Sequence, residues 1–203
     1  MAALVGGVGE LWQGDLDLGR RAAERLAGRA DLAAAGVLVE ELHYGAVAVA
    51  QRLAELRPEV LVLVGATARG RSPGTVEVTA VDRAGPAPPG AGGDAQRSVA
   101  HAVTGYVDVD LVVAVAGALG ALPADTVVVD AEPATTGPDV ELSGAGRAAL
   151  DCAVDAVVAA LAARGLLDPD GPPSGRLEDA QVLGPDGDGP PALAVQDQGA
   201  VVG

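Results

Sequence analysis

Glycines and acids follow directly after the first apolar segment of the chain. Gly7-Val8-Gly9 ends that segment, and Asp15 and Asp17 lie just before a helical pattern. Two glycines at this point allow a sharp turn and could cradle a phosphate at the start of a helix. The dinucleotide-binding fingerprint needs a third glycine three residues after the second, where this chain has Trp12. A tight turn from strand to helix is therefore the favoured interpretation.

Asp15 and Asp17 are each consistent with two roles. An acid just before a helix accepts hydrogen bonds from free N–H groups and stabilises the positive end of the helix dipole. A carboxylate in the same place could also bind a metal ion. We favour helix capping for Asp15, whereas Asp17 fits either role less well.

The other candidate metal ligands are few, because the sequence has only two histidines, His43 and His101. Glu40 and His43 follow the expected second strand, and Asp130 ends the fifth. The expected fold would direct all of these residues to one edge of its sheet and so could rebuild a metal site. For the two histidines we favour the simpler role of capping a helix or hydrogen bonding a buried carbonyl.

Three further residue types have both a functional and a structural interpretation. Arg69 and Arg71 could bind a carboxylate or phosphate through their planar guanidinium groups, but charges in a turn are more often solvated surface. Trp12, the only tryptophan, is expected in the core, and an exposed position that contacts a partner is the alternative. The single cysteine, Cys152, lies in an apolar helical pattern and is expected to be a small buried residue.

Apolar periodicity predicts strands that alternate with helices. Strands are expected at residues 2–5, 36–41, 60–66, 75–81 and 126–130, and helices at 18–26, 46–56 and 150–161. The segment 103–119 suits a helix, although residues 107–111 alternate like a strand, and the order of elements favours the helix. The strand at 75–81 is expected to pair antiparallel beside the strand at 60–66, across the turn between them. This order predicts an α/β fold with a mainly parallel five-stranded sheet between two helical layers. Functional residues are then expected where the strands end.

Composition sets the domain organisation and excludes some partners. Residues 1–165 are predicted to form one α/β domain, residues 84–93 a Pro/Gly/Ala-rich surface loop, and residues 166–203 a disordered acidic tail. The formal charge of −15 argues against nucleic acid or an anionic membrane as a partner. No segment approaches the roughly 20 apolar residues of a membrane span, so a cytoplasmic protein is expected.

Short motifs of this chain resemble those of the hydrogenase maturation proteases, in the same order. The segment Gly7 to Gly19 is similar to that family's Gly-x-Gly-Asn and Gly-Asp-Asp/Glu-Gly-x-Gly opening. Four later pieces are also similar: Ser72-Pro73-Gly74-Thr75, Ser98-Val99-Ala100-His101, Glu132-Pro133 and Glu141-Leu142-Ser143. The resemblance covers roughly the first four-fifths of the chain. It implies the family's compact α/β/α fold.

The resemblance also implies a site and identifies what this chain lacks. In the family, an acid before the first helix, an acid ending the central strand and a histidine contact nickel carried by the hydrogenase large-subunit precursor. The nickel then orients a C-terminal peptide bond for cleavage. These positions fall here at Leu16, Gly65 and His101, so only the histidine is retained. Asp15 and Asp17 flank the first position and, with His101, form our candidate metal set.

Two functions follow from the resemblance. The first is an endopeptidase that processes the C-terminus of a nickel–iron hydrogenase large-subunit precursor through a degenerate metal site, using no cofactor except nickel carried by the substrate. The second is a non-catalytic relative that binds the precursor or another partner without cleavage. A nucleotide- or sugar-binding α/β protein is a more distant third, because similar folds support unrelated sites.

Overall fold

The computed structural model describes residues 2–81 and 107–167. His101, the expected loop at 84–93 and the chain beyond residue 167 lie outside the described residues. Within them a five-stranded sheet has the order β2-β1-β3-β5-β4. Its strands are β1 (Ala3–Gly7), β2 (Val37–Glu41), β3 (Val60–Ala66), β4 (Val76–Val81) and β5 (Asp125–Ala131).

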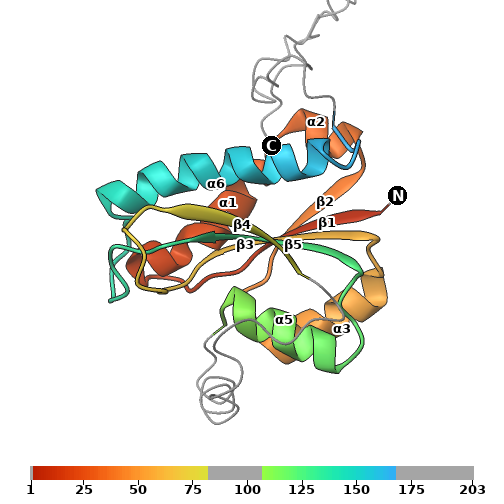
Figure 1. Cartoon of the computed structure of the whole chain (residues 1–203), viewed down its shortest axis with the longest axis horizontal. Helices are drawn as coiled ribbons and strands as arrows, with labels where there is room; N and C mark the ends of the chain where they lie inside the picture. Colours follow the sequence, from red (N-terminus) through yellow and green to blue (C-terminus); the bar gives the residue numbers. More distant parts are fainter. Residues whose placement is uncertain (1, 82–106, 168–203) are drawn as a thin grey trace, which may run out of the picture.

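Helices cover both faces of this sheet, as expected for strands connected mainly through helices. They are η1 (Gly14–Asp17, a 3-10 helix), α1 (Leu18–Ala27), α2 (Ala30–Ala34), α3 (Ala46–Leu56), α5 (Val109–Ala118) and α6 (Gly144–Ala162). Helices α1 and α6 lie on one face, and α3 and α5 lie on the other (Figure 1). The predicted three-layer α/β fold is therefore confirmed. None of the described helices is both long and apolar enough to span a membrane.

Strand β3 lies in the middle of the sheet, and its side chains are buried on both faces. Leu61 and Leu63 pack into the apolar cluster under α3 and α5. Val62 and Val64 pack into the cluster under α1 and α6. A continuous apolar run is the pattern that a doubly covered parallel strand requires.

The expected partner of β4 is wrong. Strand β4 pairs antiparallel with β5, with Val78 opposite Val129, and not with β3. Both sides of β3 are already occupied by parallel neighbours, β1 and β5. The only position left on that side of the sheet is the outer edge, which is where β4 lies.

The expected burial of Cys152 is also wrong, because this residue is exposed. Helix α6 buries Ala149, Leu150, Ala153 and Val157 against the sheet. Successive residues of a helix are rotated by about 100°, so Cys152 projects away from the stripe that contains Ala153. Because alanines occur on every side of α6, the sequence does not show which side of the helix is exposed.

Packing also continues slightly beyond the expected end of the domain. Leu166 and Leu167, which fall in the segment predicted as a tail, pack against the cluster under α1 and α6. The N–H of Leu166 donates to the carbonyl of Leu161 at 3.1 Å. The packed part of the chain therefore includes these two leucines.

Candidate functional site

Glycines let the first helix approach the ends of two strands directly. A Cβ atom on Gly19, in the first turn of α1, would lie 2.0 Å from the carbonyl oxygen of Val8 and 2.3 Å from that of Val64. A Cβ on Gly7 would lie 2.2 Å from the Gly19 carbonyl oxygen. Such distances leave no space for a side chain, so these glycines serve close backbone packing. This arrangement is the tight strand-to-helix turn favoured from the sequence.

The two positions where the resemblance implies acids are both closely packed here. Leu16 lies in η1 and is 8% exposed. A Cβ on Gly65, at the end of β3, would lie 2.7 Å from Cγ1 of Val109 and 3.1 Å from the carbonyl oxygen of Val8. Gly65 is not among the residues with positive φ. The obstacle to a side chain at this position is therefore packing against α5 and not backbone strain.

Asp15 is completely buried and connects distant loops. Its Oδ2 accepts hydrogen bonds from the N–H groups of Ala134 at 2.8 Å and Thr135 at 3.2 Å, and from the hydroxyl of Ser143 at 2.8 Å. Its Oδ1 accepts from the N–H of Ser143 at 2.8 Å. The Ser143 hydroxyl in turn accepts from the N–H of Gly146 and caps α6.

The expected role of Asp15 as cap of the helix that follows it is therefore wrong. Neither η1 nor α1 has a hydrogen bond from a capping side chain. Four donors from the loop after β5 and the start of α6 take both carboxylate oxygens instead. Asp15 thereby joins the motif segment that opens the chain to the segments that follow Glu132-Pro133 and Leu142.

Asp17 is also buried, but its charge is paired. It occupies the position before α1 without capping it, and its carboxylate accepts from Nε and Nη2 of Arg20 at 2.6 and 2.8 Å. Nε of Arg21 donates to the same carboxylate at 2.9 Å. Within the described ranges no three His, Cys, Asp or Glu side chains are grouped to hold a metal ion. Because His101 lies outside those ranges, its grouping with Asp15 and Asp17 remains a prediction.

Glu40 and His43 do not join Asp130. Glu40 is paired with Arg52, with N–O distances of 2.5 and 3.1 Å. Nδ1 of His43 lies 3.8 Å from a carboxylate oxygen of Glu41. Strands β2 and β5 are separated by β1 and β3, a lateral distance of about 14 Å at the usual strand spacing. These residues share an edge of the sheet but not a site.

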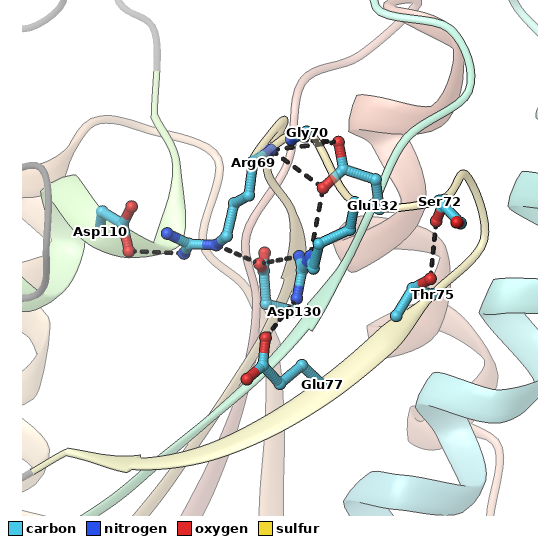
Figure 2. A network of polar contacts seen from close by, with 9 residues as sticks. Arg69, Gly70, Ser72, Thr75, Glu77, Asp110, Asp130 and Glu132 are labelled. Atoms are coloured by element: carbon cyan, nitrogen blue, oxygen red, sulfur yellow. Dashed lines mark hydrogen bonds and ion pairs between the residues drawn. The ribbon is translucent and has the colours of Figure 1, made fainter.

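Arg69 and Arg71 form an extensive polar network at this edge. Arg69 is exposed and Arg71 is half-buried, as expected for a surface turn, but both are paired with acids and are not simply solvated. Nε of Arg69 and Nη2 of Arg71 both donate to Oδ2 of Asp130, each at 2.6 Å. Nη2 of Arg69 also reaches Asp110 in α5 at 2.8 Å, as Figure 2 shows. Asp130 and Glu132 are 4% and 5% exposed. Two acids at alternate positions at the end of β5 point to one face, a signal that could have identified the arginines' partners.

Glu132 also connects this network to the Pro73-Gly74-Thr75 turn. The Glu132 carboxylate accepts from the N–H groups of Arg69 and Gly70 (Figure 2), and its main chain exchanges hydrogen bonds with Gly74 and Thr75. Burial raises the pKa of Glu132, but the bonds from Arg69, Arg71 and Gly70 outweigh burial and lower its pKa below the ordinary value. For Arg69 the burial effect has the opposite sign and lowers the pKa. The pairs with Asp110 and Asp130 outweigh it and raise the pKa above the ordinary value. Glu132 and Arg69 are therefore both charged at neutral pH.

Trp12 contradicts the expectation of a core residue. Its side chain is 66% exposed, and its backbone has the unusual φ of 61°. No sequence signal predicts this exposure, because a lone tryptophan is usually at least half buried. The alternative considered from the sequence, an exposed position, is the observed one.

Solved structures of hydrogenase maturation enzymes have the same fold as this chain. The hydrogenase maturating endopeptidase HybD from Escherichia coli has a TM-score of 0.57 and 22% identity, over 81% of this chain and 94% of that one. The solution structure of an endopeptidase from Escherichia coli has a TM-score of 0.61 and 20% identity, over 81% of this chain and 94% of that one. A hydrogenase 2 maturation peptidase from a Thaumarchaeota archaeon has a TM-score of 0.53 and 24% identity, over 82% and 99%.

Comparison of the sequence alone identifies no relative. No family model matches the chain, and no curated protein is significantly similar to it. The identities to the solved structures are low, yet the match extends over almost their whole length. This chain has the fold of the hydrogenase maturation endopeptidases, in a highly divergent form.

Proposed function

We propose that this chain is a hydrogenase-maturation-protease-like protein that recognises a nickel–iron hydrogenase large-subunit precursor during its C-terminal processing, through a degenerate metal site. The observation that carries this proposal is the role of Asp15. Its carboxylate joins the glycine- and acid-rich opening to the segments after Glu132-Pro133 and Leu142, three motifs of the resemblance. The motifs thus meet in space as well as recurring in sequence, around the edge of the sheet where the family's site would lie.

The contacts at the two altered positions support the degenerate site. Val109 packs into the space that a side chain at Gly65 would need, and Leu16 is buried. The flanking acids do not replace the missing ones easily. Asp15 accepts four hydrogen bonds and Asp17 is paired with two arginines, so a metal ion would have to displace these partners. Nickel carried by the precursor would therefore be contacted poorly.

The same contacts favour binding without cleavage over cleavage by a rearranged site. The deciding experiment mixes the purified chain with nickel-loaded precursor from the same organism. Sedimentation velocity measures complex formation, and mass spectrometry of the intact precursor measures loss of its C-terminal extension. Nickel-free precursor and the His101→Ala variant are the controls.

The outcomes separate the candidates. A complex with an intact precursor supports the non-catalytic candidate. Loss of the extension that requires both nickel and His101 supports the protease with a rearranged site. No complex and no cleavage would refute the proposed function in both forms.

A further inference from the structure

Trp12 is held in a backbone conformation that bulky residues avoid. Its φ of 61° lies in the left-handed region, where a side chain crowds the main chain. Strain of this kind persists only where surrounding contacts impose it, and it is concentrated at binding and catalytic sites. The residue is also the only tryptophan of the sequence. Its position therefore needs an explanation other than packing.

Hydrogen bonds to the segment around Asp139 anchor the loop that carries Trp12. The carbonyl of Trp12 accepts from the N–H of Asp139 at 3.0 Å, and the carbonyl of Asp139 accepts from the N–H of Gly14 at 3.0 Å. Just beyond Gly14, the buried carboxylate of Asp15 ties the same loop to the segment around Thr135. An anchored loop loses little conformational freedom when a partner binds, which favours affinity.

Two other exposed apolar residues lie on the same backbone segment as Trp12 or on a neighbouring one. We call Leu11, Trp12 and Val140 the Trp12 patch; they are 41%, 66% and 60% exposed. Val140 follows Asp139, so the hydrogen bond between Asp139 and Trp12 places Trp12 and Val140 on neighbouring backbone. Tryptophan is among the residues most enriched at interface hot spots, where it supplies most of the binding energy of its neighbourhood.

Charges around the patch specify the kind of partner. Asp139 and Glu141 are exposed next to Val140. Three arginines line a pocket together with Glu141: Arg21, Arg25 and Arg147. Arg21 is bound to Asp17 and to the carbonyl of Val140, Arg25 is paired with Asp151, and Arg147 donates to the carbonyl of Leu142. An acidic rim around an apolar centre attracts a segment in which apolar side chains are flanked by lysine or arginine. The net charge of −15 adds to this preference.

We propose that the Trp12 patch is the docking surface for an apolar segment with basic flanks on the hydrogenase large-subunit precursor. This inference rests on the proposed function for the identity of the partner. The patch follows β1 at the same edge of the sheet as Gly65, the end of β3, because the two strands are parallel. A precursor segment on the patch would lie beside the positions that correspond to the family's site. The contact would supply affinity that the altered acids do not.

The decisive variant is Trp12→Gly, because it separates a binding role from a structural one. Glycine adopts positive φ without strain, so removal of the ring should leave the Tm unchanged or raise it. Binding of the precursor should weaken at least tenfold. Leu119→Gly is the matched control, since Leu119 is 60% exposed but lies between the end of α5 and the start of β5, at the opposite edge of the sheet. It should leave binding unchanged.

Labelling the chain with 5-fluorotryptophan provides a direct signal, because one tryptophan gives one 19F resonance and the unlabelled precursor is silent. Addition of nickel-loaded precursor should shift this resonance and abolish its difference between H2O and D2O, which reports solvent contact. Affinity should also fall when salt is raised, because the rim is charged.

The outcomes separate this inference from the proposed function. A complex seen by sedimentation, with the 19F resonance unmoved and Trp12→Gly binding normally, would overturn the docking surface and leave the proposed function intact. A Tm lowered by several degrees in Trp12→Gly would show a structural role and overturn the docking surface as well. A precursor that forms no complex would overturn both.

Discussion

Ser143 donates two hydrogen bonds to Asp15, from its N–H to Oδ1 and from its hydroxyl to Oδ2, each 2.8 Å long. The same hydroxyl accepts from the N–H of Gly146 at 2.9 Å. The first turn of α6 is therefore positioned by a carboxylate in the loop that follows β1. This pair explains why an acid that looks like a helix cap in the sequence caps no helix directly.

We expect Asp15→Asn to destabilise the domain by about 2–4 kcal/mol, because one carboxylate oxygen becomes an NH2 group that faces N–H donors in a buried site. Urea unfolding followed by circular dichroism measures the change. Asp155→Asn is the control, since Asp155 lies on the exposed side of α6, and it should change stability by less than about 0.5 kcal/mol. Equal stability of the two variants would show that the buried carboxylate is not needed.

Gly146→Ala should also destabilise the domain. A Cβ on Gly146 would lie 2.0 Å from Oδ1 of Asp15. Overpacking of this kind costs about 1–3 kcal/mol. Gly144→Ala, in the same first turn of α6, is the matched control because a Cβ there meets nothing within 4 Å. Its Tm should stay the same or rise, and an equal drop in both variants would exclude the clash as the cause.

The native chain should bind nickel weakly, and substitutions that restore the two acids should strengthen the binding. The variant Leu16→Glu, Gly65→Asp, Val109→Ala restores both acids and removes the Cγ1 atom that would lie 2.7 Å from a Cβ on Gly65. We expect calorimetric titration to show at least about tenfold tighter binding, ~1.4 kcal/mol, than in Leu16→Glu, Val109→Ala. Tight native binding that is lost in His101→Ala would instead indicate a rebuilt site with Asp17, Glu40, His43 or Asp130.

Stability should depend on pH through Glu132. Its pKa in the folded chain is lower than the ordinary value of 4.5. The unfolded state therefore takes up the proton first, and the stabilisation by Glu132 is complete above pH 4.5 and is lost as the pH falls through the folded pKa. Glu132→Gln should reduce this acid dependence and lower stability at neutral pH. Unfolding curves at several pH values, compared with Glu77→Gln at the exposed end of the same network, test the difference.

The elements of the fold were largely predictable because local pattern specifies them. The continuous apolar run of β3 and the periodic stripe of α6 depend on neighbours in the sequence. The short helices η1 and α2 were missed, since four or five residues carry too little periodicity. The sequence does not predict whether β4 pairs with β3 or with β5, because the answer depends on which edge of the sheet remains free.

The contacts of the polar residues at this edge of the sheet are not predictable from the sequence. Asp15 was recognised as a residue of interest, yet its partners lie 119 to 128 positions away. Arg69 and Arg71 meet Asp130 and Glu132, which lie 59 to 63 positions further along. Hydrogen bonds between loops over such distances follow from the folded arrangement, which residue types alone do not reveal.

The contact between Asp15 and Gly146 also restricts the order in which substitutions can accumulate in a lineage. A larger residue at position 146 is costly while the carboxylate occupies that space. Replacement of Asp15 first gives up its hydrogen bonds but opens room for a side chain on α6. Evolution at position 146 is therefore conditional on position 15, and a paired change at the two positions would mark chains in which the attachment of α6 has been rebuilt.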